Sequence, residues 1–204
     1  MGVPDDLEVA LNEATVVGLR AEQGRAVSLL LHVLALPEDG PPDPDTRRAL
    51  VLSGVSRVRV LLRHDVPGQV DYGPALPLAD LAAVEAFFAS LTRTGDLYGW
   101  EFLDAPDLRA DWPDEVSLDL TLGPPADGTH SLYWFNECGT ADESFCIEGL
   151  VEFTDVAARR ADGTPVPVED FVAAGRRWWE AFHSGDPRVS PAAQRAQPRS
   201  PSWR

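Results

Sequence analysis

The fold of this 204-residue chain is indicated by a stretch of sequence that occurs twice. The first copy begins Leu19-Arg20-Ala21 and, after five residues, continues Val27-Ser28-Leu29. The second begins Leu108-Arg109-Ala110 and, again after five residues, continues Val116-Ser117-Leu118. In both copies, turn-forming residues separate runs rich in Leu and Val, and this order is typical of a β-hairpin. The repeat therefore predicts two similar hairpins.

Further elements recur in the same order after each hairpin. Leu52-Ser53-Gly54-Val55 has a counterpart in Phe153-Thr154-Asp155-Val156, and both lie in strand-like runs. Residues 77–81 have a counterpart in residues 167–171, and both stretches open a predicted helix. Because an internal repeat organises a whole fold, we predict an α+β protein of two tandem units. Each unit would be an antiparallel β-sheet followed by one packed α-helix. The alternative is a chance likeness between two hairpins built from common residues.

The predicted units span residues 1–95 and 96–185. Helices are expected over residues 78–92 and 167–185, where apolar residues recur at helical spacing. Residues 186–204 are rich in Pro, Ser and Arg, and we predict that this tail is disordered. A short strand is expected over residues 7–11.

A further hairpin is predicted between residues 130 and 156. Strand alternation places His130, Leu132, Trp134, Asn136 and Cys138 on one face. It places Tyr133, Phe135 and Glu137 on the other face.

Negative charge is concentrated in one part of the chain. The formal net charge is -16, and residues 101–155 contain fourteen acidic residues and one arginine, Arg109. Binding of nucleic acid needs a basic face, so this composition argues against that function. A basic protein is the partner that such a surface would attract. Three arginines, at positions 57, 59 and 63, alternate along one predicted strand, and we expect them to be solvated or paired with nearby acids.

The first residues and the apolar runs of the chain indicate the cellular compartment in which we expect the protein. The first six residues, Met-Gly-Val-Pro-Asp-Asp, lack the basic and apolar regions of a secretory signal. No apolar run approaches the roughly 20 residues that cross a bilayer. We therefore expect a cytoplasmic protein that does not enter a membrane.

Candidate metal and redox chemistry centres on two cysteines. Seven residues separate Cys138 from Cys146, which does not match the ligand spacing of a compact zinc site. A disulfide between them would not persist in a reducing cytoplasm. We therefore expect free buried thiols, and we predict no metal site and no cofactor.

The most suggestive candidate site lies around Trp134, Glu137, Asp142 and Glu143. Two carboxylates can act as general acid and base, but nothing in the spacing singles out one pair. No G-x-S-x-G, Walker A, GxGxxG or H-E-x-x-H motif is present. The sequence therefore assigns no catalytic residue, and these four residues are proposed as a binding site.

Leu11-Asn12-Glu13-Ala14, followed by a hairpin and by Leu52-Ser53-Gly54-Val55, resembles the layout of small β-rich bacterial proteins of actinobacterial type. Immunity proteins of bacterial toxin systems are among them. The resemblance covers residues 8–63 and, more faintly, 100–160, and it carries over no binding residue. It implies a cytoplasmic protein that binds another protein.

Three functions stay open on this basis. The first is a non-enzymatic interaction module, immunity-like, that binds a basic partner through an acidic surface on residues 101–155. The second is a small enzyme or small-molecule binder with its site near Trp134, Glu137 and Asp142. The third is a structural subunit of a homo-oligomer.

Overall fold

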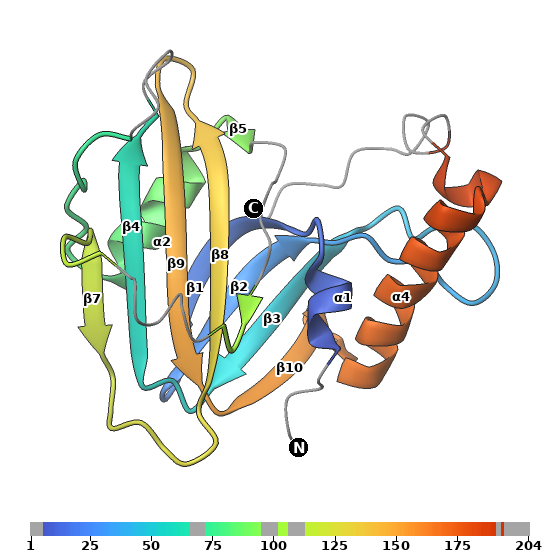
Figure 1. Ribbon diagram of the computed structural model, residues 1–204, viewed down its shortest axis with the longest axis horizontal. Helices are drawn as coiled ribbons and strands as arrows, with labels where there is room; N and C mark the ends of the chain where they lie inside the picture. Colours follow the sequence, from blue (N-terminus) through green and yellow to red (C-terminus); the bar gives the residue numbers. More distant parts are fainter. Residues whose placement is uncertain (1–5, 66–71, 95–101, 106–112, 191–192, 194–204) are drawn as a thin grey trace.

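In the residues that the computed structural model describes, two antiparallel β-sheets and three α-helices form an α+β fold (Figure 1). The structure describes residues 6–65, 72–94, 102–105, 113–190 and 193. The five-stranded sheet has the order β1 (Thr15–Glu22), β2 (Ala26–His32), β3 (Arg47–Ser53), β10 (Asp155–Arg160), β11 (Pro165–Val166). The second sheet has the order β5 (Arg93–Thr94), β8 (His130–Gly139), β9 (Ser144–Phe153), β4 (Arg57–His64), β7 (Leu118–Thr121), and β6 (Phe102–Leu103) pairs with β8. The helices are α1 (Leu7–Leu11), α2 (Leu81–Ser90) and α4 (Val168–Ser184), and a 3-10 turn, η1 (Pro187–Val189), follows α4.

Two neighbouring strands of the five-stranded sheet, β3 and β10, each continue along the chain into a strand of the six-stranded sheet. β3 pairs with β10 in the five-stranded sheet, and their continuations, β4 and β9, pair in the six-stranded sheet. The chain bends between them at Gly54, which has a φ of 64°, and at Thr154, whose N–H donates to the carbonyl of Ser53 at 2.9 Å. A side chain at position 54 would be strained there, because few L-residues adopt positive φ. The two sheets are thus joined by a shared corner.

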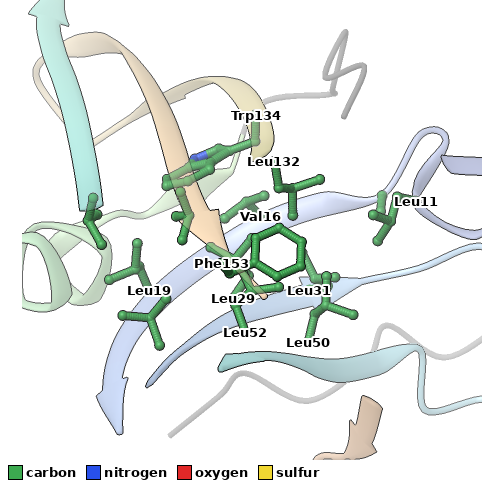
Figure 2. Close-up of a cluster of buried hydrophobic side chains, with 14 of the residues drawn as sticks. Leu11, Val16, Leu19, Leu29, Leu31, Leu50, Leu52, Leu132, Trp134 and Phe153 are labelled. Carbon is green, nitrogen blue, oxygen red and sulfur yellow. The ribbon is translucent and has the colours of Figure 1, made fainter. Parts of the chain in front are cut away.

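The main core lies between the two sheets (Figure 2). Leu29 and Leu52 project from the five-stranded sheet, and Leu132, Trp134 and Phe153 project toward them from the six-stranded sheet. All five side chains are almost completely buried. Their burial follows from the period of two along each strand, which sends alternate side chains to the same face.

The helices close the flanks of this core. α2 packs beside β1, where Arg20 and Glu85 form an ion pair at 3.2 Å. α1 and α4 pack against each other, and α4 also contacts β10 (Figure 1). Their contact is close, because a Cβ atom at Gly175 of α4 would lie 2.6 Å from the Cα of Ala10 in α1.

The α+β class predicted from the sequence is confirmed, but the tandem arrangement of two units is not. Each sheet takes strands from both halves of the chain, and β3 and β10, the predicted counterparts, pair with each other. The first hairpin is present as β1 and β2. For the second hairpin, residues 108–110 lie outside the described residues, and β7 pairs with β4. The predicted boundary between residues 95 and 96 also lies outside the described residues.

Two local predictions need correction. Residues 7–11 form a helix rather than a strand, because Leu7, Ala10 and Leu11 share one buried helical face. The predicted disordered tail starts too early at 186, because residues 187–189 form η1 and Val189 is buried in a cluster with Trp178. Most of the remaining tail lies outside the described residues. None of the described helices combines the length and the apolar character needed to cross a membrane.

Candidate interaction surface

The candidate surface is the outer face of the six-stranded sheet, which is centred on the β8–β9 hairpin. This hairpin is present as predicted, with Trp134 opposite Gly149 and Glu137 opposite Cys146. Alternation along β8 turns Trp134 toward the core and Glu137 toward solvent. The two residues therefore lie on opposite faces of the sheet.

Trp134 is a residue of the core between the two sheets. Its side chain is fully buried, and its ring lies over the backbone of Gly149. A Cβ atom added to Gly149 would lie 1.8 Å from the ring. The structure therefore does not bring the predicted group of Trp134, Glu137, Asp142 and Glu143 together on one face, since the tryptophan is separated from the three acids by the sheet.

The three acids of that group do lie at one end of the six-stranded sheet. Glu137 is exposed near the end of β8, and Asp142 and Glu143 are exposed in the turn that follows. The hydroxyl of Thr140 orders this turn by accepting hydrogen bonds from the N–H groups of Asp142 and Glu143, at 3.4 and 3.2 Å. Asp65 joins the same end, because its N–H donates to the carbonyl of Ser144 at 2.9 Å. We call Asp65, Glu137, Asp142 and Glu143 the acidic end.

Two basic groups border the acidic end. The Nδ1 atom of His64 lies 3.9 Å from a carboxylate oxygen of Glu143. A guanidinium nitrogen of Arg93 donates to the hydroxyl of Ser144 at 3.0 Å. Glu137 and Asp142 form no ion pair with any residue in the described part of the chain. The acidic end therefore keeps a local excess of negative charge.

A half-buried network adjoins the acidic end on the same face. Arg63 of β4 forms an ion pair with Glu148 of β9, and the Tyr133 hydroxyl donates to the other oxygen of Glu148 at 2.9 Å. Burial, followed by the charge of Glu148, raises the pKa of Tyr133 far above its usual value. Tyr133 therefore stays protonated and serves as a fixed donor that orients the carboxylate.

Tyr72 lies over this network. Its ring stands 4.6 Å from the guanidinium carbon of Arg63, a cation–π contact, and 6.4 Å from the ring of Phe135. Burial is the largest cause that raises the pKa of Tyr72 to about 12, and the nearby Cys146, Glu137 and Asp65 contribute to the same rise. Tyr72 is not predicted from the sequence, because its position on this face depends on a loop. Phe135 was placed on the correct face by alternation alone.

The acidity of residues 101–155 is less continuous than their composition indicates. Arg57 of β4 binds Asp119 of β7 at 2.8 Å, and Arg63 binds Glu148. Asp104 lies 2.6 Å from the ring nitrogen of His130. Strand β4 comes from the other half of the chain and inserts its arginines between two acidic strands. The expected pairing of these arginines with nearby acids is thus present for Arg57 and Arg63.

The two cysteines lie on opposite faces of the sheet. Cys138 opposes Phe145 and faces the core, whereas Cys146 opposes Glu137 and faces outward beneath Tyr72. Both thiols are free and buried, as predicted, and burial raises the pKa of each to about 12. They are poor nucleophiles for this reason. No group of three or more metal-ligating side chains occurs among the described residues.

Comparison with known proteins gives one informative similarity. The chain is 28% identical over 185 residues to a protein named uroporphyrinogen decarboxylase from Shewanella loihica, and the match covers 88% of this chain and 51% of that protein. The chain thus spans about half the length of the curated relative it matches. No family model matches the chain. No solved structure matches it either.

Proposed function

We propose that this chain is a cytoplasmic, non-enzymatic protein-interaction module, immunity-like, that binds a basic partner. The observation that carries the proposal is the acidic end, where Asp65, Glu137, Asp142 and Glu143 gather beside Tyr72 and Phe135. The proposed binding surface is therefore smaller than the predicted one, which covered residues 101–155, and it lies at one end of the six-stranded sheet. The rest of that segment is partly neutralised by the arginines of β4.

Electrostatics favours a basic partner at this place. A surface that concentrates charge of one sign accelerates association with a partner of the opposite sign, and the acceleration falls as salt screens the charges. The whole chain carries a formal net charge of -16, which adds to the attraction at long range. Glu137 and Asp142 are exposed, so a partner can reach them without unfolding the turn.

The aromatic pair supplies the apolar part of the proposed interface. Tyr72 and Phe135 are both half-buried and lie next to Glu137 and Asp65. Aromatic residues held in place by their neighbours are frequent anchors of protein interfaces. A basic segment can therefore place a guanidinium or ammonium group against the carboxylates and its apolar stem against the rings.

The proposal is tested by capture of partners on the tagged protein from lysate of its own host, at 20 and 500 mM salt. The decisive variant replaces three acids, Glu137→Gln, Asp142→Asn and Glu143→Gln. We expect a basic protein that is retained by the wild type at low salt and released at high salt. The variant is expected to bind that protein about tenfold more weakly or worse, because three charges of the contact are lost.

A matched control carries the same change of charge elsewhere. Asp127→Asn, Glu169→Gln and Glu180→Gln also remove three exposed carboxylates, in the loop before β8 and on α4. This control should bind the partner as the wild type does. Equal weakening in both triple variants would show that only overall charge matters, and the acidic end would then lose its role.

An enzymatic function is a second candidate, and it rests on the similarity to the Shewanella protein. Release of carbon dioxide from uroporphyrinogen by the purified chain would support it. Absence of release would leave no specific observation in favour of this activity.

A homo-oligomer is the third candidate. At the end of α4, Phe182 stacks on Trp178 at 5.4 Å between ring centroids and keeps 47% of its surface exposed. An apolar ring at the surface is compatible with a contact between copies. Light scattering across a hundredfold range of concentration tests whether the mass changes, and Phe182→Ser should abolish any such change.

A further inference from the structure

A cavity of about 450 Å³ is lined by residues of α4, of β11 and of the loop that follows β2. Its volume is within the range of small-molecule sites in proteins. Apolar side chains line much of it, among them Ala35, Pro165, Val166 and Phe171. This cavity is separate from the acidic end.

Three guanidinium groups line the same cavity. Arg48 and Arg160 are direct cross-strand partners in the antiparallel pair of β3 and β10. Arg177 reaches the cavity from α4, where its Nε atom donates to the carbonyl of Leu36 at 3.0 Å. Like charges directly opposite each other in a sheet destabilise it, so the Arg48–Arg160 pair needs compensating negative charge.

One carboxylate within the structure supplies that charge to both arginines. The Oδ2 atom of Asp43 accepts from Arg160 at 2.6 Å and from Arg48 at 3.2 Å. Arg48 is only 7% exposed, and it also donates hydrogen bonds to the carbonyls of Asp45 and Arg47. Burial, followed by the charge of Arg160, lowers the pKa of Arg48. Asp43 is therefore shared by a buried cation, Arg48, and an exposed one, Arg160, and the charge of Asp45 also acts on Arg48.

Glu38 and Asp170 also line the cavity, so its three carboxylates, with Asp43, equal its three guanidinium groups in number. Glu38, Asp170 and Arg160 are exposed to solvent, where charge is screened, whereas Arg48 is buried. The inner part of the cavity thus combines guanidinium groups with apolar walls. An anionic group with an apolar body matches both features, because it would relieve the repulsion between the arginines and bury its body against Phe171 and Val166.

We propose that this cavity binds a small organic carboxylate with an apolar body of about the size of an aromatic ring. The carboxylate lies toward Arg160 and Arg177, and the apolar body lies against Phe171. Arg48 holds the inner wall and Asp43 in place. This site is independent of the proposed protein partner and uses none of the residues of the acidic end.

The test is calorimetric titration of the full chain with 3-phenylpropionate at pH 7 and low salt. The uncharged 3-phenylpropionamide has the same shape without the negative charge. We expect the carboxylate to bind at least about tenfold more tightly than the amide, because hydrogen bonds to charged groups exceed neutral ones by that order. Arg160→Gln and Arg177→Gln are each expected to weaken binding of the carboxylate about tenfold or more.

Arg159→Gln is the matched control. Arg159 precedes Arg160 in β10, is exposed, and is not among the residues that line this cavity, so binding should be unchanged. Equal affinity for acid and amide, or unchanged affinity in both glutamine variants, would overturn the proposal. So would tighter binding of inorganic phosphate than of 3-phenylpropionate, or no heat from the carboxylate up to about ten millimolar. Circular dichroism of each variant confirms that the fold is retained.

Discussion

Trp134 and Gly149 make one contact that constrains the packing of the whole core. The tryptophan ring lies on the side of the β8–β9 pair that faces the other sheet, and glycine opposite it leaves room for the ring. In an ordinary strand, glycine weakens the sheet because it has no side chain to pack. Here the absent side chain is what allows the ring to be fully buried.

Gly149→Ala is therefore expected to destabilise the protein by about 3 kcal/mol, because overpacking of a rigid core costs on this order. Urea unfolding followed by circular dichroism measures the change. In the double variant with Trp134→Leu, the alanine should cost much less, since the ring is gone. A cost for alanine that is the same with tryptophan or leucine would contradict this explanation.

Strand β8 shows what residue patterns can predict. Alternation along residues 130–138 correctly predicts that Trp134 and Glu137 lie on opposite faces of the sheet. Alternation cannot predict that Tyr72 contacts Phe135, because that contact depends on a segment distant in sequence. Nor can it find the Arg48–Arg160 pair, which exists only once β3 and β10 are known to be neighbours.

Both predicted helices are present, and their ends differ in how well the sequence indicates them. Gly185 ends α4 in the left-handed conformation, with a φ of 75°, where the sequence predicts the end. The predicted helix over 78–92 is shorter, because the Asp80 side chain caps α2 by accepting from the N–H of Ala83 at 2.8 Å and the helix ends at Ser90. The five-residue α1 is predicted wrongly as a strand, because so short a stretch fits either period. Pairing between halves is also missed, because alternation indicates a buried face but not the neighbouring strand.

A second prediction about stability follows from the contact between α1 and α4. Alanine favours a helix over glycine by about 1 kcal/mol, yet a Cβ atom at position 175 would lie 2.6 Å from Ala10. Gly175→Ala is therefore expected to lower the free energy of unfolding by about 1 to 3 kcal/mol. Glu180→Ala, at an exposed site of the same helix, should change it by less than about 0.5 kcal/mol. A stabilised Gly175→Ala variant would show that α1 moves away freely.

At the scale of the whole molecule, charge is arranged across the two halves. Residues 101–155 carry thirteen excess negative charges. That number leaves out β4, which lies between β9 and β7 and places Arg57 and Arg63 beside their acids. The unneutralised part is consequently smaller than that count. Similar pairing occurs near the first loop, where Asp45 binds Arg47 at 2.8 Å.

The depressed pKa values of these carboxylates predict how stability depends on pH. The hydrogen bond from Arg47 is the main cause that lowers the pKa of Asp45 to about 2, and Arg57 lowers the pKa of Asp119. A carboxyl whose pKa is lower in the folded state stabilises the fold above its unfolded pKa of about 4. That contribution is lost as the pH falls through the folded value. We therefore expect the free energy of unfolding to drop between about pH 4 and pH 2.

Arg47→Gln tests the largest of these shifts. Without the guanidinium, the pKa of Asp45 returns toward its usual value, so the variant should be less stable than the wild type at pH 7 and nearly equal to it at pH 2. The difference at pH 7 is expected to be below about 1 kcal/mol, because the pair is partly exposed and screened by solvent. Urea unfolding at pH 7, 4 and 2.5 measures it. A difference that persists undiminished at pH 2.5 would mean that Arg47 stabilises the fold by packing rather than through the charge of Asp45.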